Sequence, residues 1–182
     1  KEEVSYPFGY GLSYSMFEEE IRSFKKTKDG ITLNVQVTNT SSVKGKDVVE
    51  VYASTPYSEY EMENDVEKSA VVLVGFAKTK ELERDESETL EIKIDPYLLS
   101  SYDEKNKKTF YLSKGDYYLS IGKDSHDALN AILSYQNLDG LIDQEGNPYQ
   151  KKENQVVSFF QDFDFETYSK TGDQKTTNLF SS

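Results

Sequence analysis

The sequence lacks cysteine and tryptophan, and it holds a single histidine and only four prolines in 182 residues. Without cysteine there is no disulfide framework, no thiolate metal site and no cysteine nucleophile. The longest apolar run, residues 70–77, is too short to span a bilayer, which takes about 20 apolar residues in a helix. Positive charge is also scarce, since 21 Lys and Arg oppose 33 Asp and Glu for a formal net charge of −12. Nucleic acid and anionic membranes bind basic faces, so neither is expected as a partner.

The chain is also poor in apolar residues, which make up 36% of it. A β-sandwich of about 100 residues with polar extensions accounts for this composition better than one uniform core. The chain begins Lys1-Glu2-Glu3, so we expect a piece cut from a longer protein. A missing signal peptide then says nothing about the compartment. The lack of cysteine likewise does not separate a cytoplasmic from an extracellular location in a bacterium.

From Ile31 onward, apolar and polar residues alternate in short runs that are separated by turn residues. Successive side chains of a strand point to opposite faces, so each run predicts a strand with one buried face. Such recurring strands predict an all-β sandwich or barrel, with a last short strand over 128–133. Ten alternating side chains are expected to line one core between two sheets: Ile31, Leu33, Val35, Val37, Val49, Val51, Leu90, Ile92, Leu119 and Ile121.

Three other segments need separate treatment. Apolar residues over 16–24 recur at helical spacing, and Ser15 with Glu18 fits a capping box, so the pattern alone favours a short helix. Over 95–108 we expect a helical turn followed by an exposed loop. Within 156–168, acidic residues alternate with phenylalanines, which predicts a strand with one wet and one buried face. We expect this strand, around 156–166, to lie along the sandwich or along a neighbouring domain.

No set of residues stands out as an active site. With 33 carboxylates, some will be close together in any fold, whereas a glycosidase needs two at a fixed separation in a cleft. His126 lies in Ser125-His126-Asp127, but a catalytic triad is assembled in space rather than from adjacent residues. We therefore interpret it as a loop-end histidine. We interpret as a solvated loop the acidic run made of Glu59, Glu61, Glu63, Asp65 and Glu67.

The sequence gives equally weak signals for a metal site and for a sugar-binding site. Asp139, Asp143, Glu145 and Asn147 surround two glycines, but they do not meet the spacing of an EF-hand. No metal or cofactor is therefore expected. The 14 tyrosines include candidates for stacking on sugar rings, although tyrosine also simply favours strands. The residues alone indicate a β domain with no visible active site.

One stretch resembles a known family, and it reads Phe8-Gly9-Tyr10-Gly11-Leu12-Ser13-Tyr14-Ser15-Met16-Phe17. In family 3 glycoside hydrolases, a segment of pattern Phe-Gly-x-Gly-Leu-Ser-Tyr-Thr-x-Phe links the α/β sandwich domain to a fibronectin type III-like domain. This chain departs from it by Ser15 for Thr. Residues 37–40 and 45–52 resemble that domain's first hairpin, residues 73–78 its Leu-x-Gly-Phe-x-Lys strand, and residues 115–117 its Gly-x-Tyr. Tyr117 is then the candidate for a tyrosine corner.

The resemblance implies an all-β fold, an immunoglobulin-like or fibronectin type III-like β-sandwich with N- and C-terminal extensions. It divides the chain into an interdomain linker over 1–16, the sandwich over 17–135, and a C-terminal extension or connector toward a catalytic domain over 136–182. It also implies an edge strand after the initial motif, which overrules the helical interpretation of 16–24. Short motifs near the end resemble domain-permuted members, in which the sandwich precedes the (β/α)₈ barrel.

For function, the resemblance implies a non-catalytic accessory domain that buttresses the catalytic domains of a retaining β-glucosidase. The family's nucleophile is an Asp in a Ser-Asp-Trp setting, which a chain without tryptophan cannot contain, so no catalytic residue carries over. Docking on the catalytic domains, the expected partners, is assigned to Phe8, Tyr10, Leu12, Tyr14 and Phe17. The alternatives are a carbohydrate-binding module, with a carbohydrate as partner through exposed tyrosines, and a piece that is itself an enzyme.

Overall fold

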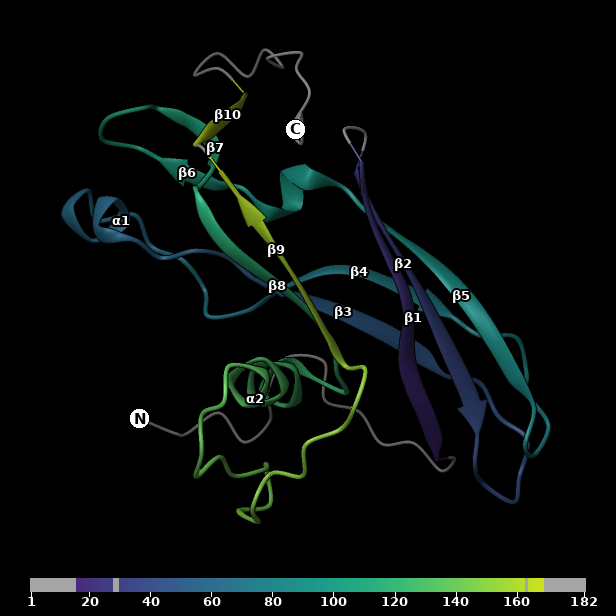
Figure 1. Cartoon of the computed structure of the whole chain (residues 1–182). Coiled ribbons are helices and arrows are strands. Elements are labelled where there is room, and N and C mark those ends of the chain that lie inside the picture. The colour runs from purple at the N-terminus through teal and green to yellow at the C-terminus, as the bar shows by residue number, and fades with distance from the viewer. Residues whose placement is uncertain (1–15, 28–29, 163, 169–182) are drawn as a thin grey trace, which may run out of the picture.

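The computed structural model describes residues 16–27, 30–162 and 164–168, and strands dominate it (Figure 1). Within these residues the first sheet has the order β1 (Phe17–Thr27), β2 (Gly30–Asn39) and β5 (Ser87–Ile94). The second has the order β4 (Val72–Lys78), β3 (Val48–Ser54), β8 (Gly115–Ile121) and β9 (Val156–Gln161). The third has the order β10 (Phe165–Tyr168), β7 (Thr109–Leu112) and β6 (Ser101–Asp103). The helical elements are α1 (Glu59–Glu63), the 3₁₀ turn η1 (Pro96–Leu99) and α2 (Ser125–Tyr135).

The first two sheets enclose the hydrophobic core, which confirms the predicted all-β sandwich. The chain passes from the first sheet to the second between β2 and β3, returns between β4 and β5, and leaves again before β8. All ten side chains that the alternation assigned to the core are buried there. The register explains this, because Val35 pairs with Leu90 and Leu33 with Ile92 across the β2–β5 ladder. Apolar residues thus face apolar residues on one side of the sheet.

The segment over 16–24 forms an edge strand rather than a helix, as the resemblance implied. β1 pairs with β2 along its whole length, and the register shifts between Ile21 and Ser23. Such a bulge inserts one residue, so the side chains on either side of it can point to the same face despite their odd spacing. Phe17, Ile21 and Phe24 all contact the core for this reason. The bulge therefore explains how residues at helix-like spacing in the sequence face the same side of a strand.

The short strand expected over 128–133 is wrong, because these residues belong to α2. The Asp124 side chain begins the helix by accepting hydrogen bonds from the backbone N–H groups of His126 and Asp127, both at 2.9 Å. His126 consequently lies in the first helical turn and not at a loop end. Ala128 and Ile132 share one buried face of α2, which contacts β3 and β8.

The tail adds strands to the sandwich, as predicted, but as two elements instead of one. β9 pairs with β8 over its full length, whereas β10 pairs with β7 in another sheet. The two elements are separate because their partner strands lie in different sheets. The helical turn expected after Asp95 is confirmed as η1, while β6 occupies part of the expected loop. β9 belongs to the segment that the sequence assigned to the C-terminal extension, yet it forms the edge strand of the second sheet. The domain boundaries stay a prediction.

Tyr117 forms the predicted tyrosine corner. Its hydroxyl donates a hydrogen bond to the carbonyl oxygen of Ser113 at 2.9 Å, and its ring is buried in the core. The bond spans four residues at the start of β8, which is the arrangement that closes a β-sandwich at one corner. The ring also stacks on Phe159 of β9, with ring centroids 5.0 Å apart. The corner thus ties the turn before β8 to the last strand of the sheet.

Candidate functional site

The docking residues expected from the sequence are placed only in part. Phe8, Tyr10, Leu12 and Tyr14 lie outside the described residues. Phe17 is the first residue of β1, where it is half-buried and packs against the core of the sandwich itself. The docking role of these five residues stays a prediction.

Two hydrogen bonds hold the point at which the chain enters β1. The backbone N–H and the hydroxyl of Thr40 both donate to the carbonyl oxygen of Met16, at 3.0 and 3.2 Å. The Met16 side chain itself is exposed. These bonds tie the start of β1 to the residue that directly follows β2.

Close to this entry point, the carboxyl group of Glu19 is crowded by other carboxylates. Burial is the main reason that its pKa is raised to about 8, and the neighbouring Asp47 raises it further by repulsion and by a hydrogen bond. Asp127 adds a smaller repulsion, and the ammonium of Lys152 offsets part of the effect. Glu19 therefore keeps its proton at neutral pH, next to Asp47 and close to Asp127 of α2.

Replacing Glu19 by Gln should raise stability at alkaline pH. The native carboxyl keeps its proton up to about pH 8, whereas the unfolded one releases it near 4.5. The native state is thus fully favoured below the lower value and loses stability as pH rises through the higher one. Gln cannot ionise and still offers a donor to Asp47. Thermal midpoints across this pH range should fall for the wild-type chain and stay flatter for E19Q.

The matched control is Glu18→Gln, an exposed carboxylate beside Glu19 on the same strand. It removes the same charge without touching Asp47, so it should leave the pH profile of stability unchanged. Parallel profiles for E19Q and the wild-type chain would show that Glu19 titrates as an ordinary carboxyl group.

At the α1 end of the sandwich, the acidic run contains one fully buried carboxylate. Glu61 is 1% exposed, so the solvated-loop interpretation is wrong for this residue. The other four are exposed as expected, but Glu59 and Glu63 lie in α1 and not in a loop. The backbone N–H and the hydroxyl of Ser58 donate to Glu61 Oε2 at 2.7 and 2.5 Å. Ser58 and Glu61 occupy the N-cap and N3 positions of a capping box. That spacing was the available signal in the sequence.

The other carboxylate oxygen of Glu61 accepts three further hydrogen bonds. The donors are Lys68 Nζ at 3.0 Å, the Tyr111 hydroxyl at 3.0 Å and the Ser113 hydroxyl at 2.5 Å. Lys68 Nζ also donates to the Ser113 hydroxyl and to the Pro56 carbonyl oxygen, both at 2.7 Å. Both side chains of the ion pair are buried, at 6% exposure for Lys68 and 1% for Glu61. We call these residues the Glu61 cluster: Ser58, Glu61, Lys68, Tyr111 and Ser113.

Within the Glu61 cluster, the Glu61 carboxylate stays ionised at neutral pH. Burial alone would raise the pKa of Glu61, but hydrogen bonds from Ser113, Ser58 and Lys68 outweigh it and lower the pKa to about 2. A general acid must carry a proton near its working pH, which this carboxylate does not. Its oxygens are also occupied by neighbours within the chain. The cluster thus serves to fix the connection between β3 and β4 against β7 and the turn before β8.

A second layer extends the Glu61 cluster toward β6. The Tyr60 hydroxyl donates to Asp103, and burial together with that carboxylate raises the pKa of Tyr60 to about 12. The ammonium of Lys107 lies 4.4 Å from the ring centroid of Tyr60 and 4.3 Å from that of Tyr111. These cation–π contacts place a basic group over two tyrosine faces. Every group in this layer is engaged in holding the loops together.

The remaining candidates do not form reactive sites. Asp127 accepts a hydrogen bond from the Lys123 N–H at 3.2 Å and so holds the turn that leads into α2. Asp143 accepts one from the Asn147 N–H at 2.8 Å and holds a turn. Across 16–27, 30–162 and 164–168, no three His, Asp or Glu side chains are placed to share a metal ion. In the same ranges, no helix has the length and apolarity needed to cross a membrane.

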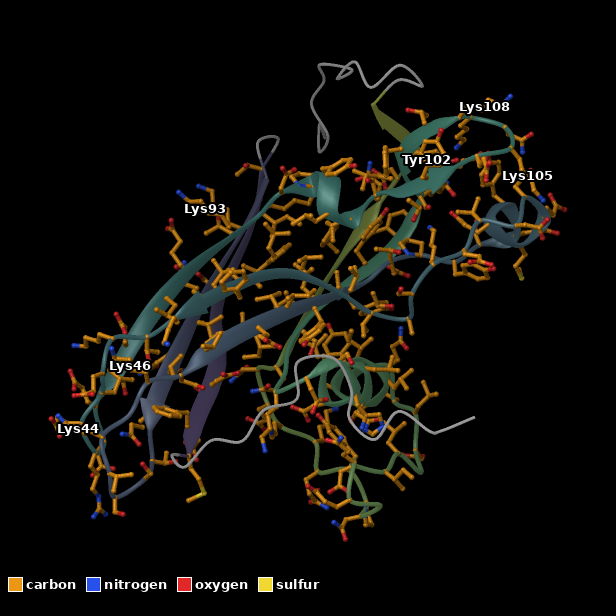
Figure 2. The ribbon with its side chains drawn as sticks, turned by 180° about the vertical axis from the view of Figure 1, so that it is seen from behind. Lys44, Lys46, Lys93, Tyr102, Lys105 and Lys108 are labelled. Atoms are coloured by element: carbon orange, nitrogen blue, oxygen red, sulfur yellow. The ribbon has the colours of Figure 1, made fainter. Side chains whose placement is uncertain are left out.

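Several aromatic side chains remain exposed on the sandwich: Tyr57, Phe76, Tyr102, Tyr135 and Phe160. Phe76 is 70% exposed although it belongs to the Leu-x-Gly-Phe motif. Tyr102, together with Lys105 and Lys108, lies at the opposite end of the molecule from Lys44 and Lys46 (Figure 2). The five exposed aromatics come from five separate parts of the chain, the residues before α1, β4, β6, α2 and β9.

Comparison with known proteins assigns the sandwich. Residues 47–125 match the model of the fibronectin type III-like domain. A β-glucosidase of Ruminococcus albus is 37% identical over 132 residues, which is 70% of this chain and 13% of that protein. An exo-α-(1→6)-L-arabinopyranosidase of Bifidobacterium longum is 33% identical over 138 residues, which is 75% of this chain and 17% of that protein. The chain therefore spans less than a fifth of the length of these relatives.

Solved structures agree with this assignment. The β-glucosidase of Kluyveromyces marxianus in complex with glucose superimposes with a TM-score of 0.67 and 30% identity, over 90% of this chain and 16% of that one. A β-glucosidase of Paenibacillus barengoltzii gives a TM-score of 0.60 and 28% identity, over 84% of this chain and 16% of that one. Each match again covers a small part of a much larger protein.

Proposed function

We infer that this chain, whose residues 47–125 belong to the fibronectin type III-like domain family, is a non-catalytic accessory domain of a family 3 glycoside hydrolase. The observation that carries the inference is that the sandwich matches only a small part of proteins named as β-glucosidases. The parent enzyme is a retaining, exo-acting glycosidase of the β-glucosidase type. The chemistry of Glu61 supports a structural role, because its charge is permanent and its oxygens are already bonded.

The partners of the domain are the catalytic domains of the same protein. The linker residues Phe8 to Tyr14 supply the docking surface, and Phe17 continues it into β1. The anchored entry of the chain at Met16 and Thr40 supports this role, since a docked linker then positions the whole sandwich. Rigid loops, such as the connection held by the Glu61 cluster, suit a buttress better than mobile ones do.

An activity assay tests the accessory role. The isolated chain should not hydrolyse an aryl β-glucoside, whereas the full-length protein should, because the nucleophile and the general acid lie in other domains. The control is the same assay on E61Q and E19Q chains, which should be equally inactive. Turnover by the isolated chain that survives repurification and is abolished by one carboxylate substitution would make the chain an enzyme and reject the accessory role.

A second candidate function is carbohydrate binding through exposed tyrosines. The observation that favours it is the exposure of Tyr57, Tyr102 and Tyr135, since the core does not need them. Binding and buttressing are separable, because only the first predicts that the isolated chain binds sugar. Calorimetry on the isolated chain distinguishes them.

A further inference from the structure

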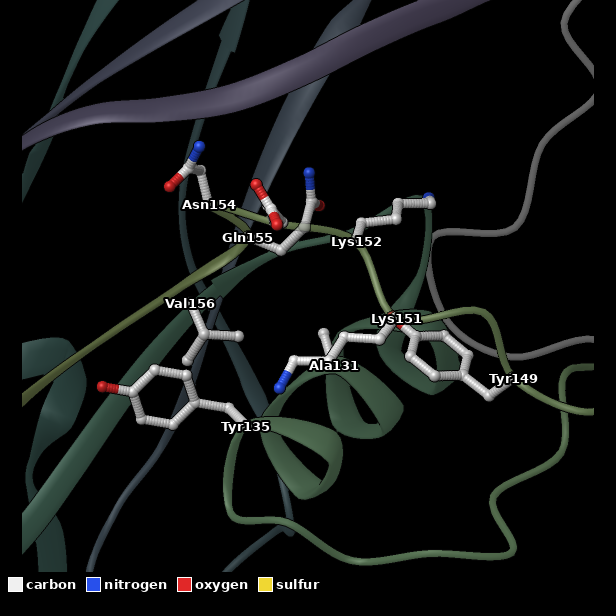
Figure 3. A pocket seen from close by; sticks show the side chains of 9 residues that line it. Ala131, Tyr135, Tyr149, Lys151, Lys152, Asn154, Gln155 and Val156 are labelled. Atoms are coloured by element: carbon white, nitrogen blue, oxygen red, sulfur yellow. The ribbon is translucent and has the colours of Figure 1, made fainter.

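The helix α2 and the loop that leads into β9 enclose an open cavity of about 330 Å³ (Figure 3). Tyr135 and Tyr149 stand on two sides of it, and the Lys151 side chain extends between them. The polar side chains of Asn154 and Gln155 lie along its upper rim. Ligand cavities in proteins measure about 300–1,000 Å³, so this one has room for a small ligand of one or two rings.

The two aromatic walls are held in place by contacts behind them. The Tyr135 hydroxyl lies 3.2 Å from the Ser158 hydroxyl of β9. The Tyr135 ring packs edge to face against Tyr118 of β8, with ring centroids 6.1 Å apart. The backbone N–H of Tyr149 donates to the Leu141 carbonyl oxygen at 2.9 Å. Burial raises the pKa of Tyr149, so its hydroxyl remains a hydrogen-bond donor at any ordinary pH.

The polar rim is also fixed to the sandwich. Gln155 donates from Nε2 to the Glu19 carbonyl oxygen at 2.6 Å, and the Ile21 N–H donates to the Asn154 carbonyl oxygen at 2.8 Å. These bonds tie the loop to β1, the strand that continues from the linker. A loop fixed in this way offers a preformed site and loses little conformational freedom on binding.

The chemistry of the lining points to a neutral, hydroxyl-rich ligand. Aromatic faces pack on the C–H faces of sugar rings, while amides and an ammonium group bond to hydroxyls. Lys151 and Lys152 are balanced by Glu153 and by Asp127, whose carboxylate lies 3.8 Å from Lys152 Nζ. With a chain charge of −12, a phosphate or carboxylate ligand would meet no net attraction.

We propose that this cavity binds a neutral β-linked glucose disaccharide beside Tyr135, Tyr149 and the Lys151 side chain that lies between them. The choice of a β-linked glucose unit rests on the proposed function, whereas the site itself rests on the cavity. The bound sugar would stack on the tyrosine rings and bond to Asn154 and Lys151. A sugar held there would keep an oligosaccharide chain close to the parent enzyme without taking part in the reaction.

Titration of cellobiose into the isolated chain tests the proposal. The wild-type chain should bind, and Tyr135→Ala and Tyr149→Ala should each weaken binding by about tenfold, which corresponds to about 1.4 kcal/mol. Tyr135→Phe and Tyr149→Phe keep the ring and should retain most of the affinity. The matched control is Tyr57→Ala, an exposed tyrosine that does not line the cavity.

Thermal midpoints of all variants establish that each one is folded. The proposal is overturned if cellobiose gives no binding signal with the folded wild-type chain, or if both alanine variants bind as tightly as Tyr57→Ala. Neither result affects the accessory role, which is judged by turnover in the activity assay. The two ideas therefore fail independently.

Discussion

Replacing Glu61 by Gln should lower the free energy of unfolding by about 3–5 kcal/mol, the range found when one partner of a buried ion pair is removed. Gln has nearly the same volume, so the loss would not come from a cavity. It comes from Lys68, whose buried ammonium would keep only neutral oxygens as partners, those of Pro56, Ser113 and the new amide. The amide also replaces a carboxylate oxygen that now accepts two hydrogen bonds from Ser58. Urea unfolding of the two chains measures the difference.

Two further variants separate the charge effect from a general disturbance of α1. Glu63→Gln changes an exposed carboxylate in the same helix and should shift stability by less than about 0.5 kcal/mol. The double variant Glu61→Gln with Lys68→Met removes both charges and should recover most of the loss, because no buried charge is left alone. Equal stability of E61Q and E63Q would show that Glu61 is not buried as an ion.

The Glu61 carboxylate also sets the acid limit of the fold. Its pKa is about 2 in the native chain and 4.5 in the reference state. A lowered pKa means that the native state binds its proton less readily than the unfolded state does. The contribution of Glu61 is therefore complete above pH 4.5 and disappears as the pH falls toward 2. The glutamine variant should lack this part of the acid transition.

The core of the sandwich was predictable from the sequence because strand alternation has one simple physical cause. In the β2–β5 ladder, Ile31, Leu33 and Val35 face Ile94, Ile92 and Leu90, and a shift of one residue would expose them all. Burial on one face therefore fixes both the register and the core. The tyrosine corner at Tyr117 was predictable too, because the Gly-x-Tyr motif identifies it.

Features that depend on contacts between distant residues were not predictable in this way. The short run over 128–133 does not exclude a helix. Two features decide for a helix, the Asp124 cap and the packing of α2 on β3 and β8. Glu61 looks like its acidic neighbours in the sequence. Its burial depends on Lys68, Tyr111 and Ser113, and the two last lie 50 and 52 residues away. Helix caps would have been the signal to weigh in both places.

The functional residues show a similar division. The family motif before β1 predicts a docking segment, and of its five assigned residues only Phe17 lies among the described ones. The sugar cavity was not predicted, because its two tyrosines come from α2 and from a loop that the sequence marks only as polar. No local pattern connects Tyr135 to Tyr149, and their juxtaposition depends on the bonds that tie the loop to β1.

Amide hydrogen exchange over residues 6–14 tests the accessory role most directly. If these residues dock on the catalytic domains, their amides should exchange about 100-fold more slowly in the full-length protein than in the isolated chain, which corresponds to about 2.7 kcal/mol of local stabilisation. Residues 31–37 of β2 are the internal control, because their hydrogen bonds lie within the sandwich and should be equally protected in both. Equal exchange of residues 6–14 in the two proteins, with β2 unchanged, would contradict the account, since the segment would then be a passive connection.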